Sequence, residues 1–75
     1  MTAADVSVVV LDERDYRYGT GELRLRIEAV DHAGALELDG EWWLPVRGVR
    51  LRRDGTEVGP LQVTVRAARL PATLR

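Results

Sequence analysis

The stretch Leu36-Glu37-Leu38-Asp39-Gly40-Glu41-Trp42-Trp43-Leu44 is the strongest indication of the fold in this 75-residue chain. Apolar and polar residues alternate before Asp39-Gly40, a dipeptide typical of the turns that join antiparallel strands. We therefore predict a β-hairpin at this turn. Adjacent residues of a strand point to opposite faces, so Trp42 and Trp43 cannot both enter one core.

The length of the turn determines which tryptophan faces the core. A two-residue turn at Asp39-Gly40 pairs Leu36 with Trp43 and places Trp43 beside the core leucines. A three-residue turn with a left-handed glycine pairs Leu36 with Trp42 instead. Strand periodicity agrees with the second arrangement, because it groups Trp42 with the apolar residues at every second position after it. We therefore favour Trp42 as the inward residue.

The rest of the sequence has a period of two almost throughout, which is typical of strands. Residues 6–11 are β-branched and nearly all apolar, as in a strand buried on both sides. Gly48 lies where the alternation changes phase, which indicates a bulge or a sharp bend. Pro71 is expected to end the ordered chain. The other strands, with apolar residues inward and charged residues outward, are predicted at 23–30, 36–38, 49–52 and 61–66.

Short strands joined by turns predict an all-β fold. We expect a small antiparallel barrel of five or six strands with no long helix, because closure removes exposed strand edges. Residues 1–75 are predicted to form one domain with an ordered core at about 5–70. A core of this size is small, so a homodimer is as consistent with the sequence as a self-sufficient monomer.

Composition excludes several functional classes. The net charge of −1 argues against strong bulk attraction to nucleic acid or to an anionic membrane. With no cysteine and one histidine, thiol chemistry, disulfides and a multi-histidine metal site are excluded. The longest apolar run, residues 8–11, is too short for a signal or membrane segment. We expect no cofactor, no metal and no membrane contact, and a cytoplasmic location.

Catalysis is not expected either. His32 follows Asp31 in a predicted turn, and two adjacent turn residues define neither a nucleophile nor a substrate groove. We interpret His32 as a solvated turn histidine.

The loop after the first strand combines acidic and aromatic residues. Tyrosine and tryptophan are enriched at recognition surfaces, and the acids would attract a basic partner. A solvated acidic loop, with tyrosines that plug the barrel ends, is the simpler alternative. The predicted partner-binding residues are Asp12, Glu13, Asp15, Tyr16, Tyr18, Trp42 and Trp43.

All eleven basic residues are arginines. Several fall on outward strand positions, so neighbouring strands could align them into a stripe that tracks a phosphate backbone. Ordinary cross-strand pairing with glutamates is the simpler interpretation. This alternative basic face comprises Arg24, Arg26, Arg50, Arg52 and Arg66.

These features resemble the Src-homology-3 (SH3-like) barrel family, in which an acidic tyrosine loop precedes a Gly-(Asp/Glu)-Trp-Trp strand. Gly40-Glu41-Trp42-Trp43 matches the tryptophan motif, and residues 10–18 match the position of the loop. The resemblance implies a groove for a proline-rich peptide. The implied groove residues are Tyr16, Tyr18 and Trp42, with Asp12, Glu13 and Asp15 as the acids that attract a basic ligand residue.

We therefore predict a non-enzymatic binding module that contacts a protein or peptide through its aromatic surface. Single-stranded nucleic-acid binding along the arginine face is the alternative function. A structural homo-oligomer, with the outward tryptophan in its interface, is a third.

Overall fold

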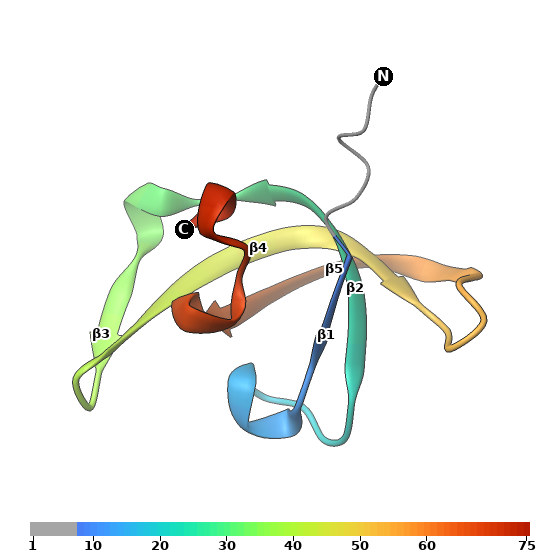
Figure 1. Cartoon of the computed structure of the whole chain (residues 1–75), viewed down its shortest axis with the longest axis horizontal. Helices are drawn as coiled ribbons and strands as arrows, with labels where there is room; N and C mark the ends of the chain where they lie inside the picture. Colours follow the sequence, from blue (N-terminus) through green and yellow to red (C-terminus); the bar gives the residue numbers. More distant parts are fainter. Residues whose placement is uncertain (1–7) are drawn as a thin grey trace.

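The computed structural model describes residues 8–75, in which five strands form an antiparallel sheet (Figure 1). The strands are β1 (Val8–Leu11), β2 (Leu23–Val30), β3 (Leu36–Leu38), β4 (Glu41–Leu51) and β5 (Glu57–Arg66). Short 3₁₀ turns are η2 (Glu13–Asp15), η3 (His32–Gly34), η4 (Ala67–Arg69) and η5 (Ala72–Leu74). For the described residues, the predicted all-β antiparallel fold is confirmed.

β4 organises the sheet. β5 pairs with residues 43–51 of β4 along one edge. β2 and β3 lie one after the other along the opposite edge of β4. β2 pairs with residues 46–51 of β4, and β3 pairs with residues 41–43. β1 pairs with the outer edge of β2. The predicted strand at 49–52 is therefore the end of β4 and not a separate strand.

The loop after β1 links the two ends of the sheet at one point. An isolated bridge pairs Tyr16 with Val65. The backbone N–H of Arg17 also donates to the carbonyl oxygen of Thr64 at 3.1 Å. The sheet formed by residues 8–75 is nevertheless open, so neither the predicted barrel nor its SH3-like type is established.

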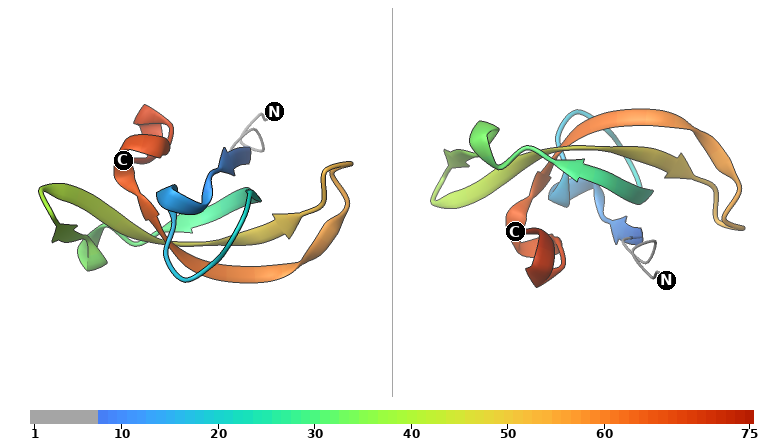
Figure 2. Two further views of the ribbon diagram at one scale, coloured as in Figure 1. Left: turned by 90° about the horizontal axis from the view of Figure 1, so that it is seen from below. Right: turned by 90° about the horizontal axis from the view of Figure 1, so that it is seen from above.

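The core lies on one face of the curved sheet. Figure 2 shows β1 and the C-terminal turns on the same side of β4 and β5. In the described part of the chain, no helix or second sheet covers the opposite, outer face. The fully buried core side chains are Leu11, Leu25, Val46, Val65 and Leu70.

The side chains of β1 are buried on one face of the strand only. Leu11 is buried and Val9 packs against the core, whereas Val8 and Val10 are exposed. The prediction of a strand buried on both sides is therefore wrong for residues 8–11, because no helix or sheet among the described residues covers their outer face. Positions 6 and 7 lie outside the described residues.

β2 passes very close to β4 at Gly48. Ile27 lies opposite Gly48. The next pair along the two strands is Ala29 with Arg47, so Glu28 has no partner in β4 and is an extra residue of β2. A Cβ on Gly48 would collide with the carbonyl oxygen of Arg26, so only glycine fits there. The predicted irregularity at Gly48 is confirmed, although the extra residue belongs to β2.

The structure continues past Pro71. Leu74 of η5 packs against the core, and its carbonyl oxygen lies 2.8 Å from Nε2 of His32. Nε of Arg75 donates to the carbonyl oxygen of Leu70 at 2.9 Å. His32 is exposed, as a solvated turn histidine would be, but it also anchors the C-terminal segment.

Candidate partner-binding surface

The turn of the β3–β4 hairpin has two residues. Asp39 and Gly40 have positive φ values of 53° and 81°, the pattern of a type I′ turn, whose twist suits antiparallel strands. Leu36 consequently lies opposite Trp43. Trp43 is 7% exposed and Trp42 is 55% exposed. The favoured three-residue turn is therefore wrong, and the buried ring is that of Trp43 and not that of Trp42.

Trp43 is buried on the outer face of the sheet, apart from the core cluster on the other face. Leu44 belongs to the core, so alternation places Trp43 on the other side and Trp42 on the core side, beyond the end of the core. The guanidinium carbons of Arg66 and Arg17 lie 5.1 and 5.7 Å from ring centres of Trp43. Such cation–π contacts are attractive, and arginine stems cover apolar surface. Arginine side chains thus cover this tryptophan.

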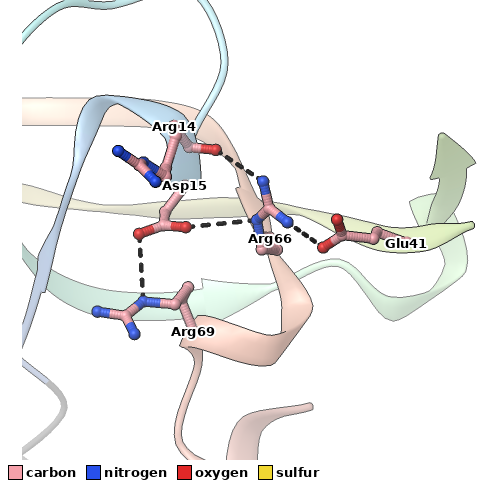
Figure 3. A network of polar contacts seen from close by, with 5 residues as sticks. All are labelled: Arg14, Asp15, Glu41, Arg66 and Arg69. Atoms are coloured by element: carbon pink, nitrogen blue, oxygen red, sulfur yellow. Dashed lines mark hydrogen bonds and ion pairs between the residues drawn. The ribbon is translucent and has the colours of Figure 1, made fainter. Parts of the chain in front are cut away.

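Asp15 is the centre of an ion network (Figure 3). It is 6% exposed. Its two carboxylate oxygens lie 3.3 Å from Nε of Arg66 and 3.2 Å from Nε of Arg69. Arg66 also pairs with Glu41 and donates to the carbonyl oxygen of Arg14 at 3.1 Å. The charges of Asp15 and Arg66 are therefore neutralised within the molecule, so the alternative of a solvated acidic loop does not hold at Asp15.

The two tyrosines of the loop after β1 lie in different environments. Tyr16 is buried in the core, and its hydroxyl lies 3.0 and 2.9 Å from the carbonyl oxygens of Thr20 and Gly21. Tyr18 is 95% exposed and has a φ of 68°. A tyrosine in this left-handed region is strained, and such strain clusters at binding sites. Only Tyr18 of the pair presents its ring to solvent.

Tyr18 borders a hollow of about 250 Å³ on the outer face, which we call the tyrosine hollow. Leu36, opposite the buried Trp43, is 40% exposed here. Our sequence analysis missed the two leucines of β3, because alternation does not tell which face of a sheet is covered. The lining residues are Arg17, Tyr18, Leu36, Leu38 and Thr64.

Asp12 and Glu13 are exposed but belong to a different hollow, lined also by Arg14, Gly21 and Glu22. A carboxylate oxygen of Glu13 accepts a hydrogen bond from the backbone N–H of Gly21 at 3.0 Å. This bond ties the two ends of the loop together. The structure therefore does not bring these two acids into the lining around Tyr18.

The predicted arginine stripe is divided into separate groups. Arg26 of β2 pairs with Glu57 of β5 at 2.9 Å, which is the cross-strand pairing of the simpler interpretation, and it lies 4.0 Å from Glu28 of its own strand. Arg66 belongs to the network around Asp15. The other three predicted residues share one hollow with a further arginine, Arg53; they are Arg24, Arg50 and Arg52.

Residues 8–75 contain no group of three or more histidine, cysteine, aspartate or glutamate side chains that could hold a metal ion. None of the helical segments described is long and apolar enough to cross a membrane. Comparisons with protein-family models, curated proteins and solved structures found no match to this chain. The function is therefore inferred from the geometry of its surface.

Proposed function

We propose that this chain is a non-enzymatic binding module that docks a protein partner on the tyrosine hollow. The supporting observation is the fully exposed ring of Tyr18 beside Leu36 and Leu38. Clustered exposed apolar side chains are typical of interaction sites. Aromatic anchors at such sites contribute most of the binding energy.

The lining of the tyrosine hollow is organised before any partner arrives. The guanidinium of Arg17 lies 5.2 Å from the ring of Tyr18 and 5.7 Å from a ring of Trp43, so it links the exposed ring to the buried one. The backbone of Arg17 is held to Thr64 by a hydrogen bond of 3.1 Å. Binding therefore requires little ordering of this loop, which lowers its entropic cost.

Among the described residues, the one charged side chain that lines the tyrosine hollow is that of Arg17, so we base the preference for a partner with basic side chains on the acids elsewhere on the β3–β4 hairpin. Glu37 and Asp39 are exposed on the same hairpin and form no ion pair with any residue in 8–75. Complementary charge steers a partner to its site and sets specificity. The proposed partner thus presents an apolar side chain flanked by basic residues, whereas Trp42 lies on the other face of β4 and does not line the tyrosine hollow.

The SH3-like type, including a complete barrel, is part of the same proposal. The family resemblance would add a proline-rich ligand held by Tyr16, Tyr18 and Trp42. Because the ring of Tyr16 is buried, we base the contact on Tyr18, Leu36 and Leu38 instead.

The test is a double substitution, Tyr18→Ala with Leu36→Ser. Val58→Ser is the matched control, because Val58 is also exposed but lies outside the tyrosine hollow. Each immobilised protein is incubated with lysate of the source organism, and retained proteins are quantified by mass spectrometry. We expect at least one protein to be retained equally by the wild type and the control. The double variant should bind that protein about tenfold more weakly, which is a loss of about 1.4 kcal/mol in binding free energy.

The proposal fails if every retained protein binds the double variant as well as it binds the control. Circular dichroism and thermal unfolding confirm that both variants are folded. Sedimentation equilibrium provides a further readout. A wild-type dimer that the double substitution dissociates would make this surface the interface of a homo-oligomer and would overturn the proposal of a separate partner.

A further inference from the structure

Four arginines surround one hollow where β2, the end of β4 and the β4–β5 turn meet. The hollow, which we call the arginine hollow, has a volume of about 510 Å³, within the range of small-molecule sites. A single acidic residue, Glu22, lines it with them. The arginines are Arg24, Arg50, Arg52 and Arg53. The site is thus strongly positive in a chain whose net charge is −1.

The nearby acids do not neutralise the arginine hollow. Glu57 pairs with Arg26 at 2.9 Å. Asp54 accepts hydrogen bonds from the hydroxyl and the backbone N–H of Thr56, at 2.6 and 2.9 Å, and these bonds lower the pKa of Asp54. Neither acid lines the hollow. In the part of the chain that the structure describes, none of the four arginines forms an ion pair.

One arginine that lines the hollow has a donor without a partner. Nε of Arg24 is buried and makes no hydrogen bond with any described residue. A buried donor without an acceptor costs free energy, more so when it belongs to a charged group. An anionic ligand that binds the other nitrogens of this guanidinium would offset part of that cost through its charge.

The turn beside the arginine hollow is held in one shape. The backbone N–H of Arg52 donates to the carbonyl oxygen of Thr56 at 2.8 Å, and the carbonyl oxygen of Arg52 accepts from Gly55 at 2.9 Å. These bonds fix the backbone from which Arg52 and Arg53 project. Little backbone ordering is therefore needed for their guanidinium groups to meet an anion.

We propose that the arginine hollow binds a small ligand that carries two or more phosphate groups. Guanidinium groups match phosphate oxygens in two-pronged geometry. One phosphate monoester carries at most about −2, so a single group leaves the four arginines and one glutamate with surplus positive charge. Leu51 and Val58 complete the lining and offer apolar contact to the rest of the ligand.

A compact ligand fits this surface better than a nucleic-acid strand does. A strand needs basic side chains along a continuous path. Beyond the arginine hollow, Arg26 is paired with Glu57, and Arg66 is paired with Asp15 and Glu41. The unpaired positive charge of the predicted basic face therefore ends at the hollow.

The experiment is a titration of the whole protein at low salt by isothermal titration calorimetry, with tripolyphosphate and inorganic phosphate as probes. We expect tripolyphosphate to bind about tenfold more tightly than phosphate. The variant Arg50→Ser with Arg53→Ser should bind tripolyphosphate about tenfold more weakly than wild type. Arg47→Ser is the matched control, because Arg47 is exposed on β4 but lies outside the arginine hollow.

Glu22→Gln gives a test of opposite sign. Removal of the acid from the hollow should raise the affinity for tripolyphosphate by roughly threefold, about 0.65 kcal/mol. Loss of protein stability cannot produce this increase. The Tyr18→Ala and Leu36→Ser pair should leave tripolyphosphate binding unchanged, so failure of this site is distinguishable from failure of the tyrosine hollow.

Three results would overturn the inference. The first is no binding of tripolyphosphate at millimolar concentration. The second is equal weakening by Arg47→Ser and by the double arginine variant, which would indicate attraction to net charge. The third is tighter binding of mixed-sequence single-stranded oligonucleotides that depends on Arg47, which would assign the surface to nucleic acid.

Discussion

Arg66 contacts an apolar ring and a carboxylate with the same guanidinium. It lies over Trp43 and pairs with Asp15, and both of these residues are buried. Nε of Arg66 faces Asp15 at 3.3 Å without hydrogen-bond geometry, so the contact is mainly electrostatic. The charge of Asp15 thus helps to hold in place the side chain that covers Trp43.

Asp15→Asn tests this arrangement at the residue scale. The amide keeps the shape of the side chain but loses the charge that faces Arg66 and Arg69. We expect the free energy of unfolding to fall by about 1–3 kcal/mol, measured by urea denaturation. Asp12→Asn removes an exposed acid and should change the free energy of unfolding by less than about 0.5 kcal/mol. Equal effects of the two substitutions would contradict the ion network.

At the scale of elements, β4 depends on a residue without a side chain. The bulge in β2 brings the backbone of Arg26 against Gly48, and this close approach joins the two strands where the sheet curves. Gly40 has a different requirement. Nothing lies near its missing Cβ, and it needs only a positive φ for the hairpin turn.

Gly48→Ala should therefore destabilise the protein far more than a tolerated substitution at Gly40. The added methyl group collides with rigid backbone, and such overpacking costs about 3 kcal/mol. Asparagine adopts the left-handed conformation, so Gly40→Asn should cost less than about 1 kcal/mol. Thermal unfolding of both variants gives the comparison. If Gly48→Ala unfolded no earlier than Gly40→Asn, the close approach would not limit this position.

The hairpin and most strands of the fold could be predicted from the sequence because they depend on local pattern. The alternation at 23–30 predicted β2 with its observed bounds, and Asp39-Gly40 located the turn. The observed two-residue turn needs a positive φ at Asp39 as well as at Gly40. The alternative three-residue turn does not need a positive φ at Asp39, and the sequence pattern did not decide between the two. The order of pairing around β4 is a long-range property that periodicity does not encode.

The candidate site was less predictable, because its residues meet through distant contacts. Tyr18 and Trp42 are exposed, as a contact surface requires, whereas Tyr16 and Trp43 are buried. Pattern alone could not separate the two tyrosines, since both precede a glycine-rich loop. The partners that bury Asp15 come from η4 and β5, far along the chain.

For the whole molecule, the core depends on the C-terminal segment. Leu70 is fully buried among side chains of the sheet, and the turn that follows is held to His32. With one open sheet, the molecule has no second layer in its described residues to replace this cover. The last turns are therefore part of the fold and not a loose tail.

Leu70→Ala measures this dependence. Truncation of a buried leucine should lower the free energy of unfolding by about 3 kcal/mol. Leu36→Ala removes the same atoms from a much more exposed position and should cost less than about 1 kcal/mol. Urea denaturation of the two variants checks the difference. Similar midpoints for both would show that the C-terminal segment adds little to the core.

The placement of Trp42 and Trp43 on opposite sides of β4 gives this protein two optical probes that are one residue apart. Trp42 is open to water, so a dissolved quencher such as iodide reaches its indole, whereas Trp43 is shielded beneath guanidinium groups. Replacing either ring with phenylalanine leaves a chain with a single tryptophan, whose emission is excited selectively at wavelengths that tyrosine does not absorb. Trp43 then reports on Arg17, which contacts both its ring and the ring of Tyr18, and Trp42 reports on the hairpin end of β4, so docking and unfolding can be followed without an attached dye.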